Sequence, residues 1–115
     1  MHHCHAHKCE ESVPIHRFVC VNHWFRLPRQ LQAAVYREYR KGQEITKTPS
    51  ARYMAVQQWC IGILAFKPHD EKAALISAYY LLKACQWRDK AIADKQGDPL
   101  KGIATDGNEE QSGTL

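Results

Sequence analysis

The sequence has no long hydrophobic run: its longest apolar stretch, residues 60–66, is far shorter than the roughly 18 residues that a membrane-spanning helix needs. Its N-terminal residues are rich in histidine and cysteine and contain no continuous apolar segment, so we expect no secretory signal peptide. We therefore predict a cytoplasmic chain that does not enter a membrane and whose thiols stay reduced. This argues against a secreted disulfide scaffold.

The sequence also lacks the motifs of common enzymes. It has no glycine-rich phosphate loop, no G-x-S-x-G nucleophile motif and no H-x-E…C-x-x-C deaminase pattern. No pair of carboxylates stands out as suited to acid–base catalysis, and no nucleophile accompanies the histidines. We therefore predict that the protein is not an enzyme.

What is present is the composition of a folded protein of modest size. The chain has 115 residues, of which 44% are hydrophobic and 24% are charged. Its composition predicts three parts: a module rich in cysteine and histidine over residues 1–26, a helical domain over residues 27–95, and a disordered acidic tail over residues 96–115. The net charge is +4, and the tail contributes −3 to it, so residues 1–95 carry +7.

Cysteine and histidine spacing predicts a metal site in the first part. Four residues fit the pattern C-x4-C-x10-C-x2-H: Cys4, Cys9, Cys20 and His23. Short spacings of this kind let each of two turns supply two ligands to a tetrahedral zinc ion. Four protein ligands leave no position for a catalytic water, so the predicted zinc is structural. It would stabilise a zinc knuckle that is too short to build its own hydrophobic core.

Two alternatives to this ligand set stay open. His5, His7 or His16 is close enough in sequence to replace one ligand, or the segment is a reduced, histidine-rich leader with no fixed metal. For the local fold, we expect residues 16–20 to form a short strand that leads into the C-x2-H turn, just before a helix.

The rest of the chain predicts about three helices. In the first, Pro28 suits the first turn and Gly42 suits the C-terminal stop. At about 100° per residue, one side of this helix is apolar: Leu27, Leu31, Ala34, Val35 and Tyr39. Glu38 also projects toward that side, where we expect either a contact with Lys41 or a position at the helix edge.

A second helix is expected with Thr48 as N-cap and Pro49 in the first turn, and it should run to about Phe66. Its broad apolar stripe predicts extensive burial: Tyr53, Val56, Trp59, Cys60, Ile61, Ile63, Leu64 and Phe66. A third helix should begin at Asp70-Glu71 and continue to about Ala93. Its candidate core positions are Ala74, Ala78, Leu81, Leu82 and Cys85. We expect both helical cysteines to be small buried hydrophobic residues.

The predicted fold is therefore mainly α, with a zinc knuckle on a short β-hairpin packed against about three helices. Opposite the apolar side of the first helix lies a stripe of four arginines: Arg26, Arg29, Arg37 and Arg40. Such a stripe suits contact with nucleic-acid phosphates, and nearby Trp24 and Phe25 suit stacking on bases. Alternatively, the arginines form a solvated helix face without a partner, or they bind an acidic protein. A second candidate basic region, on the third helix, contains Lys83, Arg88 and Lys90.

Several short motifs occur in a distinctive order: Cys4-His5-Ala6, Cys9, Phe18-Val19-Cys20, His23-Trp24, Leu27-Pro28, Gly42-Gln43-Glu44 and Thr48-Pro49-Ser50. In this order they resemble a group of small phage and prophage proteins. The resemblance covers about residues 4–66. The chain departs from the group in having only Pro14 in the segment between the cysteine pairs.

The resemblance implies an origin in a mobile element, a zinc fold and a location in the host cytoplasm, and it implies no particular activity. We predict a non-enzymatic accessory protein, stabilised by zinc, that binds nucleic acid through its basic helix face. The alternative is a module that occupies or inhibits a host protein, such as a polymerase or a defence complex.

Overall fold

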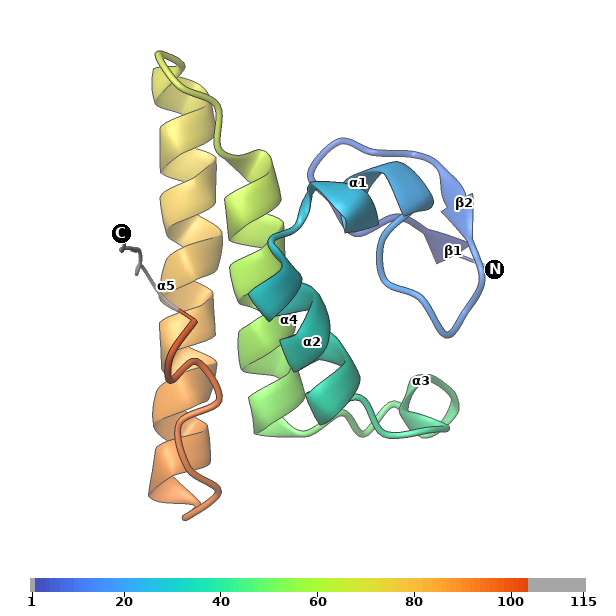
Figure 1. Cartoon of the computed structure of the whole chain (residues 1–115), viewed down its shortest axis with the longest axis vertical. Coiled ribbons are helices and arrows are strands. Elements are labelled where there is room, and N and C mark those ends of the chain that lie inside the picture. The colour runs from blue at the N-terminus through green and yellow to red at the C-terminus, as the bar shows by residue number, and fades with distance from the viewer. Residues whose placement is uncertain (1, 104–115) are drawn as a thin grey trace.

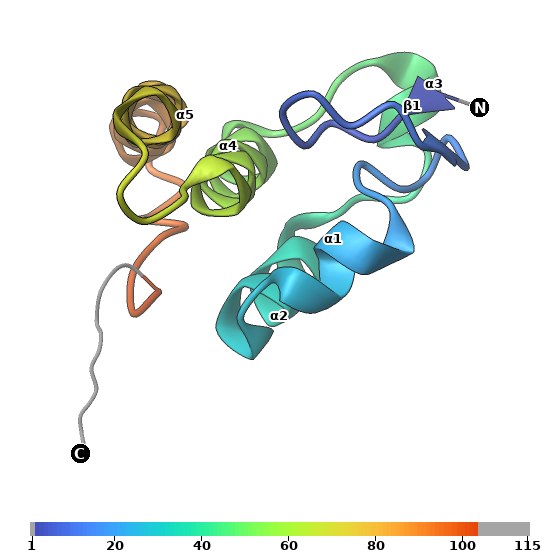
Figure 2. The ribbon, with the colours of Figure 1, turned by 90° about the horizontal axis from the view of Figure 1, so that it is seen from above.

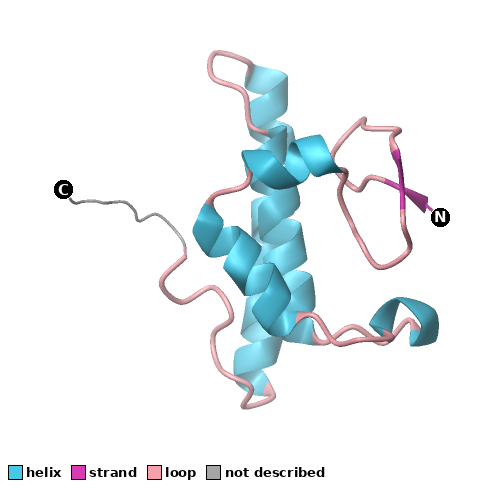
Figure 3. Ribbon diagram, turned by 45° about the vertical axis from the view of Figure 1, so that its right-hand side comes forward, coloured by secondary structure: helices cyan, strands magenta, loops and turns pink. Residues whose placement is uncertain are grey.

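The computed structural model describes residues 2–103 and has a mainly helical architecture with a small N-terminal hairpin (Figure 1, Figure 3). Over these residues the elements follow in the order β1 (His2–His3), β2 (Ser12–Val13), α1 (Val21–Arg26), α2 (Arg29–Glu38), α3 (Gln43–Thr46), α4 (Ala51–Ala65) and α5 (Glu71–Ala93). The two strands pair antiparallel, with His2 opposite Val13. The predicted fold class, mainly α with a small cysteine- and histidine-containing module, is confirmed.

The helices are arranged around α4. Seen from above, α5 lies on one side of α4, and α1 and α2 lie on the other (Figure 2). The side view has the same order, with the N-terminal hairpin beyond α1 (Figure 1). Because α4 has neighbours on both sides, Ala55, Val56 and Cys60 are each 0% exposed. The predicted extensive burial of this helix is therefore confirmed.

The start of α4 differs from the prediction by two residues. Ser50, and not Thr48, is the N-cap, because its Oγ accepts a hydrogen bond from the backbone N–H of Tyr53 at 3.0 Å. Both residues carry a hydroxyl that is able to cap a helix, so the sequence alone does not distinguish them. The helix ends at Ala65, and Phe66 is extended and exposed, outside the buried stripe.

The boundaries of α5 are as predicted, but the face that it buries is not. The Asp70 side chain caps the helix by accepting a hydrogen bond from the backbone N–H of Ala73 at 3.0 Å. The buried positions are Ala73, Ser77, Ala84 and Ala91. Of the predicted core positions, Leu81 and Cys85 are half-buried, and the other three are exposed: Ala74, Ala78 and Leu82.

Close approach of α4 and α5 explains this difference. Ser77 Oγ donates a hydrogen bond to the Gly62 carbonyl oxygen at 2.7 Å, and a Cβ at Gly62 would lie 2.7 Å from Leu81 Cδ2. Helices this close pack small side chains against each other, so the alanines and serine of α5 face inward. Apolar residues occur on more than one side of α5, so the hydropathy pattern alone does not distinguish the face that packs on α4.

The predicted helix that starts at Pro28 is shorter than expected. α2 begins at Arg29 and ends at Glu38, and Gly42, with φ of 89°, precedes the short α3 and does not end α2. Arg26 belongs to a separate helix, α1, because the chain is extended at Leu27. The predicted apolar face is confirmed. Tyr39 is half-buried against the core, and the other four residues of this face are buried: Leu27, Leu31, Ala34 and Val35.

Glu38 is a buried carboxylate held by two arginines. Arg52 of α4 donates to it from Nε at 2.9 Å and from Nη2 at 2.8 Å, and Arg37 donates from Nε at 2.6 Å. Burial alone would raise the pKa of Glu38, but these hydrogen bonds and the positive charges outweigh burial and hold its pKa below 4.5. The sequence correctly placed Glu38 on the apolar side, but the expected partner, Lys41, was wrong.

The chain after α5 packs against the same arginines. Arg37 Nη2 donates to the Pro99 carbonyl oxygen at 2.8 Å, and Arg52 also donates to the carbonyl oxygen of Gln96. Pro99 is fully buried and Leu100 is 3% exposed. The structure therefore differs from the predicted disordered tail over residues 96–103. The rest of that predicted tail, residues 104–115, lies outside the described residues.

We expect Glu38→Gln to lower the free energy of unfolding by about 2–3 kcal/mol at neutral pH, because both guanidinium groups lose their charged acceptor. The folded-state pKa of Glu38 is depressed, so its stabilisation is present above pH 4.5 and is lost as the pH falls through the lower folded-state value. Urea denaturation of the wild type and the variant between neutral and acid pH measures this difference.

Because acid also protonates other groups in both proteins, the informative quantity is the difference between the two proteins. It should shrink as the pH falls. The matched control is Glu71→Gln, at an exposed position in the first turn of α5, which should cost less than about 0.5 kcal/mol. A difference for Glu38→Gln that stays constant with pH would contradict the assignment.

Candidate metal centre

Two structural units bring the four predicted ligands together. The first is the N-terminal hairpin, in which Cys4 directly follows β1 and its backbone N–H donates to the Glu11 carbonyl oxygen at 2.8 Å. A tight turn then returns the chain to Cys9, whose backbone N–H donates to the Ala6 carbonyl oxygen at 3.0 Å. Lys8 lies in this turn with a left-handed φ of 65°.

The second unit is the start of α1. Cys20 is the residue that precedes the helix, and His23 lies in its first turn. Residues three apart at a helix start project on the same side, so the C-x2-H spacing aims both side chains at the hairpin. The C-x2-H pair therefore spans the first turn of the helix and does not precede it. The predicted strand over residues 16–20 is also wrong, because the strands are His2–His3 and Ser12–Val13.

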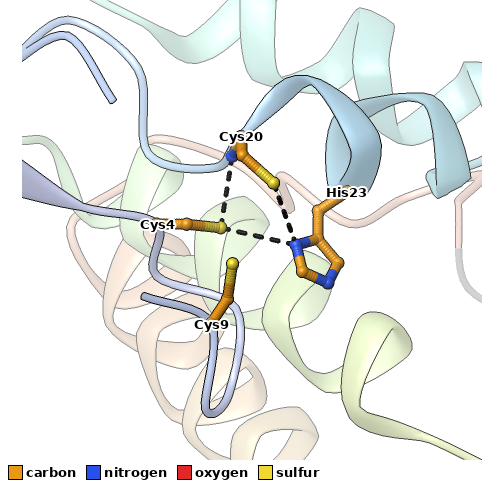
Figure 4. A group of neighbouring side chains, drawn as sticks. All are labelled: Cys4, Cys9, Cys20 and His23. Atoms are coloured by element: carbon orange, nitrogen blue, oxygen red, sulfur yellow. Dashed lines mark hydrogen bonds between the residues drawn. The ribbon is translucent and has the colours of Figure 1, made fainter. Parts of the chain in front are cut away.

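The four side chains converge on one point between these units (Figure 4). The donor atoms of Cys4, Cys9, Cys20 and His23 all lie within 4.8 Å of one another. His23 Nδ1 is 3.5 Å from Cys4 Sγ and 3.2 Å from Cys20 Sγ. A tetrahedral ion with about 2.3 Å bonds to sulfur and 2.0 Å to nitrogen needs sulfur–nitrogen separations of about 3.5 Å. The cluster therefore has dimensions that could hold a metal ion.

Burial, local hydrogen bonds and a nearby charge shift the pKa values of Cys4, Cys20 and His23. Burial raises the pKa of the Cys4 thiol to about 11. Burial alone would also raise the pKa of Cys20, but a backbone hydrogen bond at His23 and the thiols of Cys4 and Cys9 lower it. Burial and the nearby charge of Arg26 lower the pKa of His23, so its imidazole is neutral at neutral pH. A metal ion binds neutral imidazole and thiolate, and so releases protons from the thiols.

The alternative histidine ligands lie outside this cluster. Within residues 2–103, the only group of three or more potential ligands comprises the three cysteines and His23, and His5, His7 and His16 are exposed.

A backbone hydrogen bond also reaches one of the thiols. The Cys20 backbone N–H donates to Cys4 Sγ at 3.2 Å, and a hydrogen bond of this kind stabilises a thiolate. The other two cysteines are remote from the cluster: Cys60 is fully buried, with a pKa raised by burial to about 12, and Cys85 is half-buried on α5.

The four predicted arginines do not form one helix face. Arg26 belongs to α1, Arg29 and Arg37 belong to α2, and Arg40 lies beyond the end of α2. Arg37 is occupied by Glu38 and by the Pro99 carbonyl oxygen. Among the described residues, no side-chain hydrogen bond or ion pair is found for Arg26, Arg29 or Arg40, and all three are exposed.

Sequence reasoning missed two features near these arginines. One is Arg52, the main partner of Glu38, which lies in another helix and carries no local signal. The other is an aromatic pocket beside α1, to which residues 16–19, α1, α2 and α4 all contribute. Its signal in the sequence is the aromatic content of residues 18–39, of which only Trp24 and Phe25 were predicted to stack on bases.

The comparisons with known proteins add no further constraint. The chain matches no family model, no curated protein sequence and no solved structure. Over the described residues, no helix has the length and apolarity needed to cross a membrane.

If the cluster holds a metal ion, Cys20→Ser should remove it and should destabilise the protein more than Cys60→Ser does. Cys60 is a small buried hydrophobic residue, so its replacement by serine should cost about 1–3 kcal/mol and leave the metal content unchanged. Cys20→Ser removes one donor and leaves three others without a complete coordination shell. Elemental analysis and thermal denaturation measure the two effects. Equal melting shifts and equal metal contents would count against the site.

Proposed function

We propose that the cluster of Cys4, Cys9, Cys20 and His23 binds a structural zinc ion. Three thiols and one imidazole are the donor set that zinc prefers, and four protein donors complete its tetrahedron without an open position for water. The filled site has a net charge of −1, because three thiolates outweigh the divalent ion. The zinc ties the hairpin to α1, which a module of this size cannot achieve by hydrophobic burial alone.

We further propose that the zinc-stabilised module presents arginines to nucleic acid. The observation that carries this proposal is the exposure of Arg26, Arg29 and Arg40, which lie in or beside α1 and α2. Residues 104–115 contain three acidic residues and no basic one, so residues 1–103 carry +7. Exposed guanidinium groups on a chain of this charge suit phosphate contacts. The proposed activity is binding, without catalysis.

The resemblance of residues 4–66 to small phage and prophage proteins supports an origin in a mobile element. In this proposal the protein acts in the cytoplasm of the host as an accessory protein of that element. A polyanion such as DNA or RNA is abundant there, and a basic surface on a rigid module is a common way to bind it.

A second candidate function is the binding of a host protein. The observation in its favour is a row of exposed apolar side chains on α5: Leu75 at 72%, Tyr79 at 55% and Leu82 at 59% exposure. Apolar side chains at this helical spacing suit contact with a partner. Salt separates the two candidates, because phosphate contacts weaken steeply with ionic strength and an apolar contact does not.

The test of nucleic-acid binding is the double charge reversal Arg29→Glu with Arg40→Glu. Arg37 is unsuitable because its reversal would disrupt Glu38, and Arg26 is unsuitable because its charge lies near His23. If both arginines contact phosphates, the variant should bind more weakly, and its log–log salt slope should be smaller by about 1.4 to 1.8. Fluorescence anisotropy with labelled single-stranded DNA, duplex DNA and RNA measures both quantities.

The matched control is Lys72→Glu with Lys95→Glu, which makes the same charge change at exposed positions in and just after α5. That helix lies on the side of α4 away from α1 and α2 (Figure 2). The control should retain more affinity than the arginine variant and keep the wild-type salt slope. If the wild type binds none of the three nucleic acids at low salt, the proposal is wrong. If both variants weaken binding equally, the arginines are not the docking site.

A further inference from the structure

A pocket of about 330 Å³ opens beside α1, and none of the four residues of the Cys/His cluster lines it. Six aromatic side chains line it: Phe18, Trp24, Phe25, Tyr36, Tyr39 and Tyr53. They come from the segment before α1, from α1 and α2, and from the chain around the start of α4. The volume falls within the roughly 300–1,000 Å³ of small-ligand sites in proteins. The pocket is therefore large enough for a flat aromatic ligand.

Two of the aromatic rings are mostly in solvent. Phe25 and Tyr36 are each 74% exposed, although both line the pocket. Tyr36 packs against Trp24 edge to face, with 5.4 Å between ring centroids, so its ring has a fixed neighbour. Exposed aromatic rings grouped around a concavity are unusual for a surface without a ligand. A flat π system would bury them by stacking.

The charge of the lining favours an anionic ligand. Arg17 is the only lining residue with a permanent charge, His16 is the only other ionisable nitrogen, and no carboxylate lines the pocket. The surrounding chain is strongly basic, with +7 over residues 1–103. A ligand that combines a flat aromatic ring with a negative group fits both features. A nucleotide unit of nucleic acid is such a ligand, with its base in the pocket and its phosphate next to a guanidinium.

We propose that this pocket takes an unpaired base of single-stranded nucleic acid, with Tyr36 and Phe25 as stacking residues and Arg17 at the adjacent phosphate. The inference rests on the proposed function and adds to it a preference for single strands. A base within a duplex is stacked between its neighbours and enters a pocket only by flipping out, which costs a few kcal/mol. A single strand has no pairing to break, so it gains the full stacking energy.

The experiment compares three probes: an oligothymidylate, an abasic strand of the same length with the same phosphates, and a duplex of that length. Wild-type protein should bind the oligothymidylate about 10-fold or more tightly than the abasic strand, because the abasic strand has no base to stack on the aromatic residues of the pocket. Tyr36→Ala and Phe25→Ala should each reduce this preference and leave the affinity for the abasic strand unchanged. Tyr36→Phe, which keeps the ring, should retain the preference.

The matched control is Tyr79→Ala, at an exposed tyrosine on α5, which should bind all three probes as the wild type does. Equal affinity of the wild type for the oligothymidylate and the abasic strand would contradict the proposal that the pocket binds a base. It would leave the proposed phosphate binding by the arginines intact. A base preference that survives both Tyr36→Ala and Phe25→Ala would place the stacking site elsewhere and also overturn the pocket. Failure of every probe to bind at low salt would overturn this inference together with the proposed function.

Discussion

The fold of the N-terminal module and the position of α1 depend on the convergence of three thiols and one imidazole between the N-terminal hairpin and α1. The hairpin has only two paired residues in each strand and few buried side chains, so it has little hydrophobic core of its own. An ion held by Cys4, Cys9, Cys20 and His23 would cross-link it to the first turn of α1. That link would fix α1, and α1 carries two of the pocket's aromatic rings.

The remaining helices provide the support against which this module is oriented. α4 packs closely on α5 through small side chains on one side, and it receives α2 on the other. Glu38 joins α2 to α4 through Arg52, at a buried position where a carboxylate needs charged partners. Arg26 and Arg29 therefore lie, along the chain, between two anchors: the Cys/His cluster at the start of α1 and the buried ion pair at the end of α2.

Local patterns in the sequence predicted what depends on local chemistry. The ligand spacing, the start of the third helix at Asp70-Glu71 and the apolar side of α2 each depend on a few neighbouring residues, and the structure agrees with them. Some local predictions were wrong, such as Thr48 as the N-cap of α4, but the larger differences depend on distant parts of the chain. The inward face of α5 is set by Gly62 on another helix, and the partner of Glu38 is 14 residues away along the chain. Pro99 and Leu100 are buried because the segment after α5 packs against α2 and α4, where Arg37 and Arg52 bind its carbonyl oxygens.

The most direct test of the central claim is amide hydrogen exchange on the full chain before and after metal removal by a chelator. If the Cys/His cluster holds the N-terminal module together through a metal ion, residues 4–26 should lose protection when the metal is removed. The amides of α4 and α5 should keep theirs, because that helix pair is held by its own packing. Unchanged protection of residues 4–26 in protein shown to be metal-free would contradict the account.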